Sequence, residues 1–158
     1  MSAYEIQTKE AFTVLGYGTR LPGDYAQIPA AKAAWWQTVI NDGRWDQLKN
    51  LADNDLEFAV NEAVNNEMWY YSGVQSNAEL PDGKDSRAIQ FPAGEYLVIA
   101  GSADNEGQLF GQLEGAAFGE VLSNVTDFAY VGGPNTSVKT SEIDGKVSGE
   151  IWIPVVRK

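Results

Sequence analysis

The chain has 158 residues and a formal net charge of −11, and it contains neither cysteine nor histidine. This composition excludes disulfide bonds, zinc–thiolate sites, cysteine nucleophiles and any catalytic triad that needs a histidine base. The acidic balance also argues against direct binding of DNA or RNA, and it leaves a basic protein partner open. We expect one domain, spanning residues 1–158.

The sequence also lacks the patterns that mark metal sites, phosphate-binding loops, signal peptides and membrane-spanning segments. No metal-ligand cluster and no glycine-rich phosphate motif stands out, so we expect neither a metal site nor a cofactor. The N-terminal residues do not form a basic stretch followed by an apolar run, and no apolar stretch approaches the roughly 18 residues that span a bilayer. We therefore expect a cytoplasmic protein that does not associate with membranes.

The first part of the chain predicts the order strand, helix, strand, strand. Alternating apolar and polar residues indicate a strand over residues 4–21, and apolar residues at helical spacing indicate a helix over 30–51. Two strands follow at 56–60 and 67–75, with Asn65-Asn66 as the turn between them. The polar segment 78–85 then reads as a linking loop.

The second part repeats this order. Residues 86–100 indicate a strand pair broken at Pro92-Ala93-Gly94, and residues 107–122 indicate a helix with one apolar face. The last strands are expected at 125–130, 137–141 and 146–156, with Asp144-Gly145 in a hairpin turn. Glycines recur every four residues in the predicted helix, and we expect this smooth face to pack closely against the sheet or a partner: Gly107, Gly111, Gly115 and Gly119.

Two short sequence matches suggest an internal duplication. Glu67-Met68-Trp69-Tyr70 recurs as Glu150-Ile151-Trp152-Ile153 at a displacement of 83 residues (150 − 67), and residues 12–16 resemble residues 96–100 at a displacement of 84 (96 − 12). We expect pseudo-repeats at about 4–77 and 86–156. The predicted fold is α+β: two strand-helix-strand-strand halves with pseudo-twofold symmetry, a largely antiparallel sheet with helices on one face, and a ligand groove between the halves.

Three phrases in the chain resemble a known family. They are FTVLGY at residues 12–17, FPAGEYLV at 91–98 and EIWIPV at 150–155. Together they resemble the GyrI-like small-molecule-binding domain, also called the bacterial transcription activator effector-binding domain, and the likeness covers nearly the whole chain. The resemblance implies a duplicated strand-helix-strand-strand fold and a groove for bulky, aromatic and often cationic compounds. It also implies a stand-alone domain, because the chain has no room for a helix-turn-helix before Phe12.

Aromatic residues are the main candidates for ligand contact. Flat rings stack on planar ligands and attract cations through their faces. Adjacent strand residues point to opposite faces, so Trp69 and Tyr71 share one face and Tyr70 takes the other. The expected ligand-binding residues are Trp35, Trp36, Trp69, Tyr71, Tyr96, Phe118, Lys139 and Trp152.

Lys139 enters this set because of a departure from the family pattern. The resemblance implies a glutamate facing the groove in the penultimate strand, and the best-matching segment here places Lys139 at that position. An ammonium group there would favour neutral or anionic aromatic ligands and would put hydrolase chemistry in doubt. The competing interpretation is a lysine that points to solvent.

We expect the chain to bind or sequester a bulky aromatic small molecule without catalysis. One alternative is a hydrolase of reactive aromatic toxins, since one branch of the family hydrolyses strained cyclopropane-containing toxins. The other is a protein-interaction module of the gyrase-inhibitor type, which would use its acidic surface on a basic partner.

Overall fold

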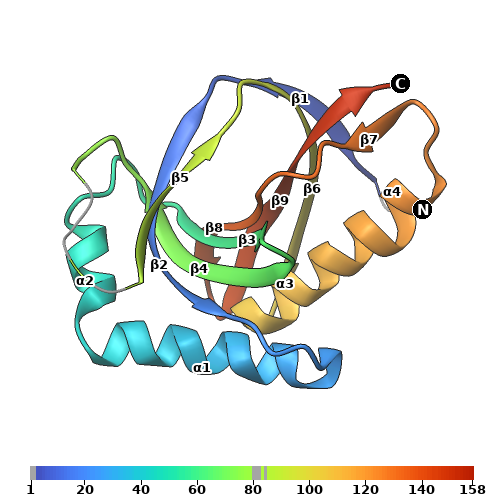
Figure 1. Cartoon of the computed structure of the whole chain (residues 1–158). Helices are drawn as coiled ribbons and strands as arrows, with labels where there is room; N and C mark the ends of the chain where they lie inside the picture. Colours follow the sequence, from blue (N-terminus) through green and yellow to red (C-terminus); the bar gives the residue numbers. More distant parts are fainter. Residues whose placement is uncertain (1–2, 80–82, 84) are drawn as a thin grey trace. The chain divides into compact units, whose positions relative to one another are not determined.

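The structure, a computed structural model, describes residues 3–79, 83 and 85–158, which fall into two compact units. The first unit is Phe12–Phe91, and the second combines Met1–Ala11 with Pro92–Lys158. Residues 80–82 and 84 of the expected linking loop lie outside the described residues. Figure 1 traces the elements of both units.

The first unit contains two main helices and four strands. Asp24 caps its short 3₁₀ turn, because its carboxylate accepts from the Ala26 amide. The expected helix over 30–51 is two helices, since Gly43 takes a positive φ of 89° at the break. The elements are β2 (Phe12–Arg20), η1 (Tyr25–Gln27), α1 (Ile28–Asn41), α2 (Arg44–Lys49), β3 (Glu57–Val64), β4 (Glu67–Gln75) and β5 (Ser86–Phe91).

The strands of the first unit pair in the order β3-β4-β2-β5, and each pairing is antiparallel. Asn65 and Asn66 both take positive φ values, 52° and 66°, in the tight turn between β3 and β4. One face of this sheet is covered by α1 and α2. Apolar side chains from the helices and from β2 and β4 form that core: Leu15, Tyr17, Val39, Trp45, Leu48 and Val74.

The second unit has one long helical segment and five strands. In the helical segment a π-helical stretch follows α3 without a break. The expected single strand over 4–21 is two strands, and its first part belongs to this unit. The elements are β1 (Glu5–Lys9), β6 (Gly94–Ala103), α3 (Glu106–Glu114), η2 (Gly115–Val121), α4 (Leu122–Asn124), β7 (Phe128–Tyr130), β8 (Asn135–Ile143) and β9 (Lys146–Arg157).

The strands of the second unit pair in the order β8-β9-β6-β1, with β7 also paired to β9, and again each pairing is antiparallel. The helix α3 covers one face of this sheet. Gly101 and Gly149 lie beneath its side chains, because a Cβ added at either would meet Leu109. The expected apolar helix face is confirmed by the buried residues Leu109, Phe110, Leu113, Ala117 and Val121.

The α+β fold with largely antiparallel strands and helices on one face of the sheet is therefore confirmed. The strand orders β3-β4-β2 and β8-β9-β6 match between the two units. The number of residues that separates matching elements, however, differs from the expected 83 to 84. The hairpin turns at Asn65 and Asp144 differ by 79 residues (144 − 65). Trp69 is two residues from the start of β4 and Trp152 is six from the start of β9, so they lie on corresponding strands at different positions. The pseudo-twofold symmetry and the groove between the halves stay predictions.

The glycine stripe does not pack against the sheet, so that part of the expectation is wrong, while packing against a partner stays a prediction. A Cβ added at Gly111, Gly115 or Gly119 would meet no atom of the described residues within 4 Å, and one at Gly107 would meet only the Asn105 cap. These glycines therefore lie on the open side of the helix. In the described residues, no helix is both long and apolar enough to cross a membrane.

Candidate functional site

The site begins with strand alternation on β4. Tyr70 points toward the helices, where its hydroxyl accepts a hydrogen bond of 2.7 Å from the indole Nε1 of Trp36. Trp69 and Tyr71 therefore face away from the helices, as their alternation predicts. Their ring centroids are 6.5 Å apart and their planes differ by 20°. We call this side of the first unit its helix-free face.

Glycines leave room for these rings. Gly18 on β2 lies opposite Tyr71, and Gly16 lies opposite Gly73. A Cβ added at Gly18 would stand 2.2 Å from a carbon of the Tyr71 ring, so the ring lies directly over the glycine backbone. Glycine inside a strand often marks a close approach of another group. These three glycines form the floor of the helix-free face.

An ion pair crosses this floor. Arg87 on β5 is paired in register with Gly16 on β2, and two strands, β2 and β4, separate β5 from β3, where Glu62 lies. The Arg87 Nε donates to one carboxylate oxygen of Glu62 at 2.8 Å, and its Nη2 donates to the other at 2.7 Å. The Glu62 side chain is only 11% exposed, whereas that of Arg87 is 45% exposed. The long arginine reaches over β2 and β4 because the floor carries no side chains.

Tyr71 joins the same network. Its hydroxyl donates to the Glu62 carboxylate at 3.3 Å. Burial, with the negative charge of Glu62 as a second cause, raises the pKa of Tyr71 to about 12. The hydrogen bond to Glu62 in turn raises the pKa of the Arg87 guanidinium. Both groups therefore keep their protons at neutral pH, which leaves one carboxylate held by a guanidinium and a phenol.

A pocket opens over the rings and this ion pair. Its volume is about 370 Å³, within the range of small-molecule sites. All of its lining residues belong to the first unit, and they combine apolar rings with charged groups: Val64, Asn65, Glu67, Trp69, Tyr71, Asp85, Ser86 and Arg87.

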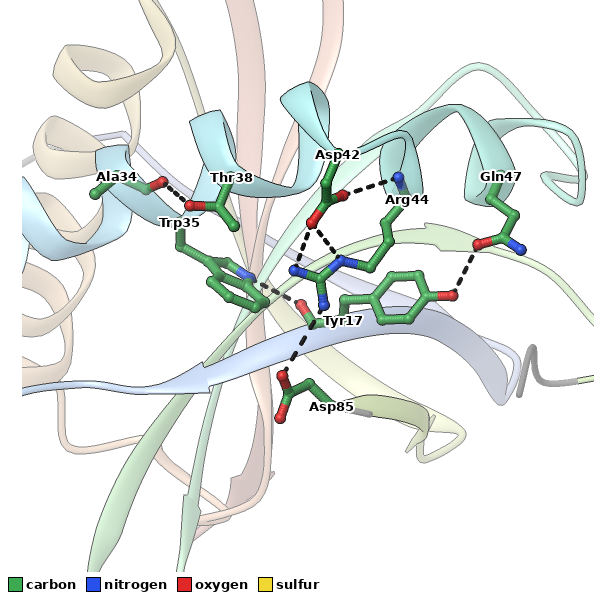
Figure 2. Close-up of polar contacts among 8 residues, drawn as sticks. All are labelled: Tyr17, Ala34, Trp35, Thr38, Asp42, Arg44, Gln47 and Asp85. Atoms are coloured by element: carbon green, nitrogen blue, oxygen red, sulfur yellow. Dashed lines mark hydrogen bonds and ion pairs between the residues drawn. The ribbon is translucent and has the colours of Figure 1, made fainter. Parts of the chain in front are cut away.

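Asp85, just before β5, is held by contacts on the helix-covered side of the sheet. The Gly18 amide donates to the Asp85 carbonyl at 2.9 Å, and the Asp85 carboxylate lies 3.9 Å from Arg44. Arg44 also pairs with Asp42 at 2.9 Å and lies over the Tyr17 ring, 5.1 Å from its centroid. Figure 2 shows this cluster. It holds Asp85, and with it the strand that carries Arg87.

The structure separates the predicted site residues of the first unit into two groups. Trp69 and Tyr71 line the pocket. Trp35 and Trp36 lie on the opposite, helix-covered side: the Trp35 indole donates to the Tyr17 carbonyl at 3.0 Å (Figure 2), and Trp36 packs edge-on against Trp45. These two tryptophans therefore help to join α1 to the sheet. Their role in ligand binding stays a prediction.

The predicted residues of the second unit do not form one cluster. Tyr96 is fully buried, and its hydroxyl donates to the Pro92 carbonyl at 2.7 Å. Phe118 is 37% exposed on the π-helical segment. Trp152 is 8% exposed, donates to Glu150 at 2.8 Å and lies beneath the Lys9 ammonium, whose distance to the ring centroid is 3.9 Å.

Lys139 lies on the helix-covered side of the second unit. Its ammonium nitrogen is 2.7 Å from Glu106 of α3 and 3.4 Å from Glu142, and its side chain is 13% exposed. Its positive charge is thus balanced by two carboxylates. The competing interpretation of a solvent-facing lysine is wrong. Lys139 is not among the residues that line the pocket of the first unit.

Sequence reasoning missed Glu62, Arg87 and the glycine floor. The available signal was Gly16-x-Gly18 inside a predicted strand, together with Gly73 in another, because such glycines mark a surface that something else covers. Among the described residues, no group of three or more acidic side chains is placed to hold a metal ion.

Comparisons with known proteins add to this geometry. No curated protein matches the chain. Several solved structures share its fold. SAV2435 bound to tetraphenylphosphonium has a TM-score of 0.74 and 18% identity, over 98% of this chain and 94% of that one. A putative bacterial transcription regulation protein from Staphylococcus aureus MU50 has a TM-score of 0.74 and 17% identity, over 98% and 99%. Integron cassette protein VCH_CASS2 from Vibrio cholerae has a TM-score of 0.61 and 13% identity, over 97% and 95%.

A family profile covers almost the whole chain as well. The profile of Cass2, the integron-associated effector binding protein, matches residues 5–155. The GyrI-like resemblance of the three sequence phrases is thereby confirmed. The chain belongs to the Cass2 family of integron-associated effector binding proteins.

Proposed function

We propose that the protein binds a bulky aromatic small molecule in the pocket of the first unit. The observation that carries this proposal is the pair of nearly parallel rings, Trp69 and Tyr71, in an open pocket of about 370 Å³. Trp69 is partly exposed in this concave site, and Tyr71, which is 4% exposed, packs beside it. An accessible aromatic ring offers a large contact area at low entropic cost. The glycine floor keeps that area open rather than filled.

The expected affinity is modest. Aromatic pairs contribute about 0.5–1.5 kcal/mol each beyond their area burial. A dissociation constant near 1 μM requires about 8 kcal/mol, which stacking on Trp69 and burial of a bulky apolar ligand together can supply.

Two findings on related proteins support the proposal. The family to which the chain belongs is described as effector binding, and one solved structure with the same fold holds tetraphenylphosphonium, a bulky aromatic cation. Its bulk and its aromatic rings are the features that support the proposal. That the ligand is aromatic, and that it binds over Trp69 and Tyr71, is our own proposal.

The test is calorimetric titration with a panel of acridine, rhodamine and triphenylmethane dyes. Wild-type protein should bind at least one dye at micromolar concentration. Trp69→Leu should weaken that dye about tenfold, because one stacking partner is lost. Tyr25→Leu is the matched control, since Tyr25 is 87% exposed and does not line the pocket.

The control should bind like the wild type. Equal affinity of wild type and Trp69→Leu for every bound dye would place the ligand elsewhere and contradict the proposal.

A further inference from the structure

Glu62, which is bonded to the pocket-lining residues Arg87 and Tyr71, already has a cation. Glu62 accepts from Arg87 through both oxygens, at 2.8 and 2.7 Å, in a two-pronged fork. Such bidentate pairs have fixed geometry and are among the stronger hydrogen-bonded ion pairs. Tyr71 adds a third donor to the same carboxylate at 3.3 Å. A cationic ligand that entered the pocket would find this carboxylate engaged. The two carboxylates that line the pocket also have cations: Glu67 lies 3.2 Å from Arg20, and Asp85 lies 3.9 Å from Arg44.

The surroundings make this pair different from a surface ion pair. Glu62 is 11% exposed and lies beside aromatic rings, where charges interact more strongly than in water. Arg87 lines the pocket, so a cationic ligand would also meet its positive charge. An uncharged aromatic molecule would need no carboxylate and would not be repelled by Arg87. The paired Arg87 and Glu62 carry no net charge.

The chain contains a matched pair outside the pocket. Arg157 holds Glu95 with the same fork in the second unit, at 3.0 and 3.1 Å. The Glu95 side chain is 34% exposed, about three times the exposure of Glu62. Neither residue lines the pocket. The pair therefore offers the same chemistry without the rings.

We propose that Arg87 is a built-in counter-cation of Glu62 and determines the charge selectivity of the pocket. While the two are paired, the pocket accepts uncharged aromatic molecules in preference to cationic ones, and a cation binds only when it displaces Arg87 from Glu62. This inference rests on the proposed function, since it concerns the ligand of the same pocket.

The test compares two probes of the same shape at pH 8. N-methylacridinium is a cation, and 9-methylacridine is its uncharged counterpart at this pH. The measured quantity is the ratio of the affinity for the cation to the affinity for the neutral probe. The wild type should bind the neutral probe more tightly than the cation.

Variants should move this ratio in opposite directions. Arg87→Met leaves Glu62 unpaired, and the ratio should rise at least about tenfold in favour of the cation, as expected for one charge a few ångströms away. Glu62→Gln leaves Arg87 unpaired, and the ratio should fall about tenfold. The double variant should return to within about threefold of the wild type. Arg157→Met should leave the ratio within the same range, because Arg157 does not line the pocket.

Each outcome decides the matter. If Arg87→Met does not fold by circular dichroism, Arg87→Gln repeats the test with an amide that can still bond Glu62. A ratio that stays within threefold in Arg87→Met or Arg87→Gln, with both probes bound, overturns the inference alone. Absence of binding by either probe to any variant, with a dye panel equally unbound, overturns the proposed function and the inference with it.

Discussion

The helix-free faces of the two units carry the same kinds of side chain in different arrangements. In the first unit, Tyr71 lies over Gly18, and Arg87 reaches across the sheet to Glu62. In the second, Trp152 is paired with Val98, and Lys9 sits over the Trp152 ring. An aromatic ring, a carboxylate and a cation from an outer strand are present in both.

The two faces differ in the residue that is paired with the aromatic ring, which is Gly18 for Tyr71 and Val98 for Trp152. Glycine lets the Tyr71 ring lie down on the sheet and lets Arg87 cross above it, and the pocket of the first unit lies at this place. The two rings themselves are about equally buried, since Tyr71 is 4% exposed and Trp152 8%. The pocket of the first unit is therefore set apart by the partly exposed Trp69 and by Arg87, which both line it.

The largest effect should come from filling the floor of the first unit. Gly18→Val places a side chain where the Tyr71 ring lies, as Val98 stands beside Trp152. Overpacking of this kind costs about 1–3 kcal/mol of unfolding free energy. Chemical denaturation should show this loss, and the dye that binds the wild type should no longer bind the variant at micromolar concentration.

Gly111→Ala is the control for that variant. Its Cβ would meet no described atom within 4 Å, and it lies in α3, so alanine should stabilise the protein by about 0.5–1 kcal/mol. Unchanged stability and unchanged dye binding in Gly18→Val would show that the floor does not shape the pocket.

A smaller effect concerns two tyrosines with the same elevated pKa. Burial raises the pKa of Tyr96 to about 12, and burial together with Glu62 raises that of Tyr71 to about 12. Because both pKa values lie above the ordinary value of 10, each tyrosine contributes stability that is complete below pH 10 and is lost as the pH rises through 12. Spectroscopic titration of the phenols should detect both late steps.

Glu62→Gln distinguishes the two tyrosines. Removing the carboxylate takes away a negative charge beside Tyr71 and leaves Arg87, so the pKa of Tyr71 should fall toward 10 while that of Tyr96 stays in place. Tyr71→Phe and Tyr96→Phe assign the two steps. A Tyr71 step that does not move in Glu62→Gln would mean that burial alone sets its pKa.

The sequence predicts local features of the fold well and the site only in part. The alternation in β4 correctly places Trp69 and Tyr71 on the face opposite Tyr70, and both expected hairpin turns are found. These features depend on neighbouring residues, whose propensities and periodicity can be read directly. The break of the first helix at Gly43 is also local, because it depends on the positive φ of a single glycine.

The rest depends on strand order, which local patterns do not contain. Glu62 and Arg87 are 25 residues apart and meet only because β5, β2, β4 and β3 are neighbours in that order. Trp35 and Trp36 are aromatic like the other candidate ligand contacts. Their packing against the core follows from the orientation of α1, which the local pattern does not give. Lys139 illustrates the same point, since its contact with Glu106 follows from the packing of α3 on β8.

The most direct test of ligand binding at Trp69 uses the indole N–H signals of the five tryptophans. Each signal in a nitrogen–proton correlation spectrum reports on one indole, and Trp→Phe variants assign them. Titration with 9-methylacridine should shift the Trp69 signal at micromolar concentration. The Trp152 signal, whose N–H is bonded to Glu150 beneath Lys9, should stay in place. A titration that shifts Trp152 and leaves Trp69 unmoved would contradict the account.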